Sequence, residues 1–143
     1  MSSRFKDISN KLLIIGKFKG VGTVLDSGLQ YKECLAFSLF KSKPLWVVQL
    51  SSQTWTNDDT ETPLHAESGI LKISNSSSDN NLPVEASFVH PFSLTEFEYG
   101  YYNILDNKLD LEIEDLQRGK SAKGKLTSAY KRTYWINKSG ELQ

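Results

Sequence analysis

The sequence of 143 residues has one cysteine and one methionine, and it has no long uncharged apolar run. The single Cys34 excludes an intramolecular disulfide, and the start Met1-Ser2-Ser3-Arg4-Phe5 lacks the apolar core of a signal peptide. No segment approaches the roughly 18 apolar residues of a membrane-spanning helix. We therefore expect a protein of the reducing cytoplasm with no membrane partner.

The chain also lacks an excess of charge of either sign. Lys and Arg number 17, and Asp and Glu number 17. Because nucleic acids and anionic membranes attract basic proteins, this balance gives no support for either partner. The length and the 38% hydrophobic content suit one globular domain over residues 1–143. The charge balance does not exclude a small apolar molecule as the ligand.

Helical periodicity is confined to the N-terminus, where Asp7 or Ser9 can cap a short helix that ends at Gly16. From Gly16 onward apolar residues recur with a period of two, which predicts β-strands. The expected strands are Gly16–Leu25, Tyr31–Ser38, Leu45–Trp55, Leu64–Ile73, Val84–His90, Leu94–Asn103, Leu109–Ile113 and Leu126–Ile136.

Two of these strands have clear faces. In Leu109–Ile113 the apolar residues alternate with acids, so we expect these acids to form a solvated face. In Leu94–Asn103 the aromatic residues point one way, whereas Glu96 and Glu98 point the other.

About eight strands joined by short turns predict an all-β, antiparallel up-and-down β-barrel. A β-sandwich is the alternative. A barrel of about eight or more strands can enclose one small ligand, whereas a sandwich fills its interior with side chains. Gly16, Gly20 and Gly22 share one face of the first strand with Phe18, and His65 and His90 are expected to point inward. Both features favour the barrel.

Several motifs together resemble one family. Gly16-Lys17-Phe18-Lys19-Gly20-Val21-Gly22 looks like the glycine–tryptophan–glycine signature of nitrobindins, haem-binding barrels that also form the C-terminal domain of a THAP-type protein. The most specific match is Pro63-Leu64-His65-Ala66-Glu67-Ser68-Gly69. The other matches, in the family's order, are Tyr31-Lys32-Glu33, the Lys43-Pro44 turn, Thr54-Trp55 and Val89-His90-Pro91, so that the resemblance covers roughly residues 12–143.

The resemblance implies a lipocalin-like or fatty-acid-binding-protein-like barrel of about eight to ten strands that holds a ferric haem b. It also implies nitric-oxide binding and the isomerisation of peroxynitrite to nitrate. The positions that it assigns to the haem site are Gly16, Phe18, Gly20, Gly22, Leu64, His65, His90, Lys123 and Lys125.

Two features depart from the family pattern. Phe18 replaces the tryptophan of the signature, which keeps the aromatic bulk and loses an indole N–H. Similar proteins continue past the Gly140-Glu141-Leu142 turn into a closing strand and the histidine that ligates the iron, whereas this sequence stops at Gln143. We therefore expect an incomplete barrel that binds haem weakly or not at all and that forms homodimers or aggregates through its open edge.

The two histidines have competing interpretations. By resemblance His65 lies in the cavity on the side of the haem away from the proximal ligand, and it would supply any residual iron ligation. The alternative is a wall histidine that is hydrogen-bonded to Glu67 or to backbone. We expect His90 at the rim of the cavity. Lys123 and Lys125 lie near the position of a family lysine that meets the haem propionates, with solvated loop lysines as the alternative.

The resemblance favours a haem barrel that acts on reactive nitrogen species, in which the iron does the chemistry and no side chain need act as acid or base. Peroxynitrite isomerase is the enzyme activity that it implies. The alternative from a different class is a non-catalytic barrel for a fatty acid or similar apolar ligand, or a degenerate copy that has lost haem.

Overall fold

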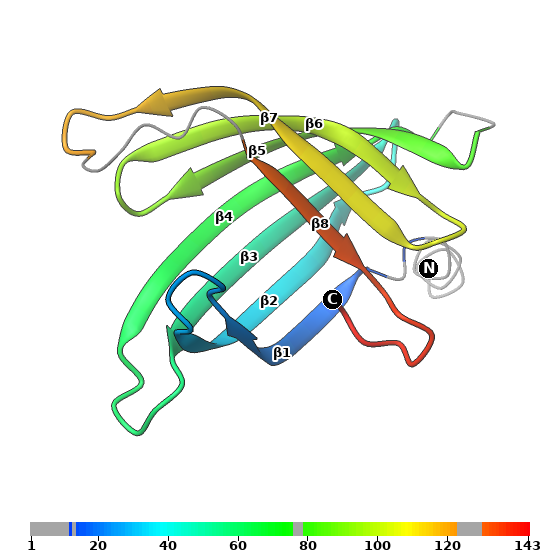
Figure 1. Cartoon of the computed structure of the whole chain (residues 1–143). Helices are drawn as coiled ribbons and strands as arrows, with labels where there is room; N and C mark the ends of the chain where they lie inside the picture. The colour runs from blue at the N-terminus through cyan, green and yellow to red at the C-terminus, as the bar shows by residue number, and fades with distance from the viewer. Residues whose placement is uncertain (1–11, 13, 76–78, 123–129) are drawn as a thin grey trace.

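A computed structural model shows one antiparallel sheet of eight strands (Figure 1). It describes residues 12, 14–75, 79–122 and 130–143. The strands are β1 (Gly16–Thr23), β2 (Gln30–Lys41), β3 (Trp46–Thr56), β4 (Pro63–Ile73), β5 (Asn81–His90), β6 (Leu94–Asn103), β7 (Lys108–Arg118) and β8 (Lys131–Trp135). Each strand pairs with its neighbours in the chain, which confirms the predicted all-β, up-and-down arrangement.

The sheet is a curled half-barrel, whereas the sequence predicted an up-and-down barrel left open at one seam. In Figure 1 the later strands arch over the first ones, but no pairing joins β1 to β8 within the described residues. The chain turns back on β8 at its end, since Trp135 and Gln143 exchange backbone hydrogen bonds of 3.2 and 2.8 Å. This segment pairs with the last residue of β8 and with Ile136 beyond it. Homodimerisation through an open edge stays a prediction.

The expected N-terminal helix lies almost entirely outside the described residues. Leu12 and Ile14, which are described, are 0% and 1% exposed. Both belong to the hydrophobic core. The segment before β1 therefore contributes side chains to the interior.

Every second side chain of a strand points to the same face, so the concave face collects one set of alternating residues. At one end this face is apolar, with Phe37, Leu50, Leu71, Phe88 and Tyr102 among its buried members. Further along the same strands the inward positions become polar, as the pairing of Ser52 with Glu67 next to that of Leu50 with Gly69 illustrates. The core and the polar region are thus two ends of one interior.

Strand β6 has its two acids and Tyr102 inside, and Phe97, Tyr99 and Tyr101 outside. Glu96 and Glu98 are 4% and 0% exposed, whereas Tyr99 and Tyr101 are 43% and 57% exposed. The sequence predicted opposite faces for the two sets, and the structure shows that the acidic face is the inner one. Such buried carboxyls need either a partner of opposite charge or a bound proton.

Gly69 ends the histidine-containing motif and provides space for a neighbouring aromatic ring. It pairs directly with Phe88 across the β4–β5 ladder. A Cβ at this position would overlap the Phe88 ring and lie 2.8 Å from the carbonyl oxygen of Ser87. A side chain larger than glycine would therefore displace Phe88.

We predict that Gly69→Ala lowers the free energy of unfolding by about 1–3 kcal/mol, because the added methyl group overpacks this position. The matched control is Gly20→Ala, whose Cβ would meet no atom within 4 Å. This control should leave stability unchanged or raise it by up to about 1 kcal/mol. Urea unfolding of both variants measures the difference, and equal effects would contradict the packing argument.

Candidate functional site

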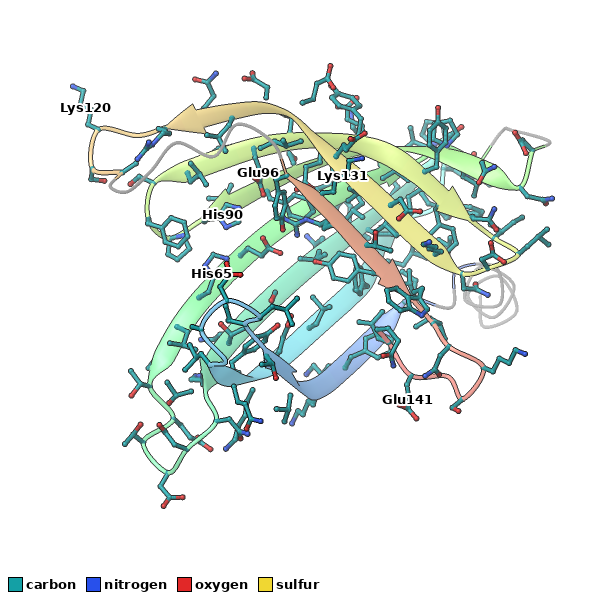
Figure 2. The ribbon with its side chains drawn as sticks, viewed as in Figure 1. His65, His90, Glu96, Lys120, Lys131 and Glu141 are labelled. Atoms are coloured by element: carbon teal, nitrogen blue, oxygen red, sulfur yellow. The ribbon has the colours of Figure 1, made fainter. Side chains whose placement is uncertain are left out.

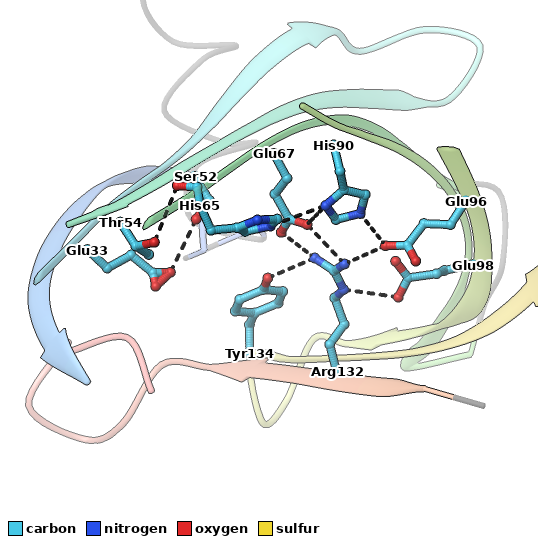
Figure 3. Close-up of polar contacts among 10 residues, drawn as sticks. All are labelled: Glu33, Ser52, Thr54, His65, Glu67, His90, Glu96, Glu98, Arg132 and Tyr134. Carbon is cyan, nitrogen blue, oxygen red and sulfur yellow. Dashed lines mark hydrogen bonds and ion pairs between the residues drawn. The ribbon is translucent and has the colours of Figure 1, made fainter. Parts of the chain in front are cut away.

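Arg132 of β8 reaches across the interior and has a partner for each of its five N–H donors (Figure 3). Nη1 and Nη2 bind the two oxygens of Glu67 on β4 at 2.6 and 3.2 Å. The second hydrogens of these nitrogens go to Tyr134 at 3.1 Å and to Glu96 at 3.0 Å. Nε donates to Glu98 at 3.0 Å. No donor is left to bind a ligand.

The arginine is also held by aromatic rings. Its guanidinium carbon lies 4.0 Å from the centroid of the Phe88 ring and 5.1 Å from that of Tyr130. Such contacts stabilise a desolvated cation. Burial raises the pKa of Tyr130 to about 12, against the opposing effect of Arg132. Tyr130 therefore remains a neutral neighbour of the cation.

Three buried glutamates surround this single arginine, so negative charge is in excess. Burial, with the nearby Glu96, raises the pKa of Glu98 to about 7 despite the charge of Arg132. Oε2 of Glu98 is a buried side-chain atom that has no hydrogen-bond partner among the described residues. The Glu98 carboxyl is thus protonated as pH falls through about 7.

A hydrogen-bonded chain runs from Glu96 to the two histidines. The Nε2 atom of His90 lies 2.9 Å from Oε1 of Glu96, and its Nδ1 atom lies 3.2 Å from Nε2 of His65. Burial acts to raise the pKa of Glu96, but the hydrogen bond and charge of His90, with Arg132, lower it overall. Glu96 is therefore ionised and accepts the Nε2–H of His90.

The ionised Glu96 fixes the tautomers of both rings. When His90 is neutral, its proton is on Nε2, so its Nδ1 accepts a hydrogen bond from the Nε2–H of His65. Burial and the neighbouring His90 lower the pKa of His65, which favours the neutral ring. The Nδ1 atom of His65 then has a free lone pair, with no partner among the described residues.

His65 and His90 border a cavity of about 540 Å³ inside the half-barrel. In Figure 2 both histidines and Glu96 lie between the curled halves of the sheet, whereas Lys120 and Glu141 lie at the periphery. The Phe92 ring lies 5.2 Å from the His65 ring and 5.7 Å from the His90 ring. The other apolar and aromatic wall residues are Val24, Leu29, Tyr31, Leu64, Leu94, Leu116, Tyr130 and Tyr134.

Two hydrogen bonds fix the part of the wall that adjoins His65 on β3 and β2. The Ser52 hydroxyl donates to Glu33 at 3.3 Å, and the Thr54 hydroxyl donates to the carbonyl oxygen of His65 at 3.3 Å. Burial raises the pKa of Glu33, while the bond from Ser52 opposes that shift. This wall therefore adds a further weakly acidic carboxyl to the cavity.

The first-strand residues that were expected at the same cavity border a different hollow. Phe18, Gly20 and Gly22 line a space of about 470 Å³ next to Leu142. The two hollows share the walls Tyr31, Glu33 and Tyr134. Gly16 borders neither of these two hollows, because its open side lies against the Phe18 ring. The residues that were expected to line one pocket therefore lie in two: the histidines border the larger cavity, and Phe18, Gly20 and Gly22 border the smaller hollow.

His90 is not a rim residue, as the sequence had suggested, because its side chain is only 8% exposed. Lys123 and Lys125 lie outside the described residues. Sequence reasoning missed Arg132, Glu96 and Glu98 as site residues. A signal was present, since Arg132 alternates in phase with Tyr130, Tyr134 and Ile136, and a charge on such a face requires a buried partner.

Comparison with known proteins gives one family match. The model of the THAP4-like, heme-binding beta-barrel domain matches residues 8–143. No curated protein matches the chain. Within the described residues, no helix has the length and apolar character needed to cross a membrane.

We predict that Arg132→Gln lowers the free energy of unfolding by about 3–5 kcal/mol, since it leaves buried carboxyl groups without their cation. The control is the adjacent Lys131→Gln, which removes an exposed ion pair with Glu112. This control should cost no more than about 1 kcal/mol. Chemical unfolding at one pH compares them, and similar losses would contradict a structural role for the buried pair.

We predict that Glu98→Gln reduces the loss of stability between pH 5 and pH 8. The folded-state pKa of Glu98 is raised from 4.5 to about 7, so its contribution is complete below 4.5 and disappears as pH rises through about 7. Glutamine resembles the protonated form at every pH. The exposed Glu114→Gln should retain the wild-type slope, and a Glu98→Gln slope as steep as the wild type would contradict the assignment.

Proposed function

Because the chain belongs to the family of THAP4-like, haem-binding β-barrel domains, we propose that it binds haem in the cavity beside His65. The cavity's volume of about 540 Å³ lies within the roughly 300–1,000 Å³ range of small-molecule and cofactor sites. Its walls combine aliphatic and aromatic side chains, which suit the apolar ring of a porphyrin, with the half-buried imidazole of His65, which is a common ligand type for haem iron. The apolar wall at the imidazole of His65 is the observation that carries the proposal.

A bound haem would supply an iron at which nitric oxide binds and peroxynitrite isomerises to nitrate. Leu64 and Phe92, which line the cavity, would supply apolar contacts to the macrocycle. The Nδ1 atom of His65 would either ligate the iron or accept a hydrogen bond in the cavity. Through His90, Glu96 would hold that ring in one tautomer.

The acidic cluster argues against the fatty-acid alternative. A fatty-acid carboxylate needs a free donor in the interior, and the donors of Arg132 are all engaged by protein groups. The carboxylates of Glu67 and Glu96 would also repel it. A neutral apolar molecule, or no ligand, remains as the outcome if haem does not bind.

We predict that haemin added to the full chain gives a Soret band distinct from that of free haemin. Leu64→Arg should raise the Kd for haemin at least about tenfold, because it places a charge in an apolar site. Leu105→Arg, at an exposed position, should not change it. No shifted Soret band, or equal effects of both variants, would contradict haem binding in this cavity.

The chemistry is tested separately on the haem-loaded chain by stopped-flow decay of peroxynitrite and by the yield of nitrate. A faster decay than with free haemin, with more nitrate, would support the activity. Replacement of His65 by alanine should alter the haem spectrum. An unchanged spectrum would remove His65 from the proposed haem site.

A further inference from the structure

A group of three side chains on β4 and β5 has the composition and spacing of a metal-binding site. The ligand atoms of His65, Glu67 and His90 lie within 4.8 Å of one another. His65 Nε2 and His90 Nδ1 are 3.2 Å apart, and His90 Nδ1 and Glu67 Oε2 are 3.7 Å apart. In a tetrahedral zinc site with bonds of about 2.0–2.1 Å, neighbouring ligands lie roughly 3.3–3.5 Å apart.

We propose that His65, Glu67 and His90 bind a divalent first-row transition metal ion, with Zn²⁺ as the reference ion. Two imidazoles and one carboxylate suit such ions, and three protein ligands leave one coordination position open. All three residues line the 540 Å³ cavity, so the open position faces the space that a ligand can enter. This site shares His65 and the cavity with the proposed haem site, but it does not rest on haem binding.

The groups behind the three ligands have the arrangement expected around a metal. Ligating histidines usually donate their other ring N–H to a carboxylate, and His90 donates its Nε2–H to Glu96 at 2.9 Å. Arg132 holds both oxygens of Glu67, which orients the carboxylate. Each carboxylate oxygen has two lone pairs, so Oε2 of Glu67 retains one for an ion.

Charge balance favours the same conclusion. The interior contains three glutamates, Glu67, Glu96 and Glu98, against the single positive charge of Arg132. With Glu98 protonated this leaves one negative charge in excess, and with Glu98 ionised it leaves two. A divalent cation between the histidines would neutralise that excess, and it would replace the proton that the two facing ring nitrogens share.

The direct test uses the full chain without haem. Calorimetry with Zn²⁺ should show one equivalent bound per chain. In the Co²⁺ form, NMR should show two paramagnetically shifted ring N–H signals, one from each of the two histidines in the sequence. Binding no tighter than that of the double variant His65→Gln/His90→Gln, or a shifted signal from one histidine alone, would overturn the proposal. The NMR measurement needs no variant.

A matched pair of substitutions tests the supporting carboxylate. Glu96 and Glu98 both contact Arg132, but only Glu96 contacts His90. Glu96→Gln should raise the Kd for Zn²⁺ by about 10–100-fold. Glu98→Gln should change it less than about threefold when measured below the Glu98 pKa of about 7, where this carboxyl is largely protonated. An equal loss of Zn²⁺ affinity in both variants would show that the hydrogen bond from His90 to Glu96 does not support a metal ligand, which would contradict the proposal.

Discussion

The bidentate ion pair between Arg132 and Glu67 joins two strands that are not neighbours in the sheet. It runs from β8 to β4 across the interior, with contacts of 2.6 and 3.2 Å. Because the described backbone makes no pairing between β1 and β8, side-chain contacts of this kind hold the curl of the half-barrel. The pair also fixes the position of Glu67, and through Glu96 the same arginine reaches the histidine chain.

The interior contains more buried carboxyl groups than cationic groups, and this excess leaves polar atoms that a bound ligand or ion can use. This cluster includes one carboxyl, Glu98, whose pKa is raised to about 7, and it leaves one imidazole nitrogen of His65 without a partner among the described residues. Apolar walls beside it line a cavity of about 540 Å³. The polar cluster and the apolar cavity therefore share His65 as their boundary residue.

Much of the fold could be predicted from the sequence, because a strand is recognised from apolar and polar residues that alternate within a short segment. Leu94–Asn103 was predicted with the bounds that β6 has, and the pairing order follows from short turns. The inward direction of Glu96 and Glu98 did not follow, because alternation separates two faces without saying which is inside. Their partner Arg132 lies more than 30 residues away, and its position depends on the curvature of the whole sheet. His90 was misplaced for a similar reason, since alternation gives the direction of a side chain and not its depth.

The most direct test of this arrangement is the NMR spectrum of the Arg132 guanidinium group in the folded chain. If Glu67, Glu96, Glu98 and Tyr134 engage all five donors, rotation about the C–N bonds and hydrogen exchange are both slowed. Separate, slowly exchanging Nη–H signals are then expected, with nuclear Overhauser contacts to Phe88. A single averaged Nη signal that exchanges at the rate of a solvated arginine would contradict the buried network.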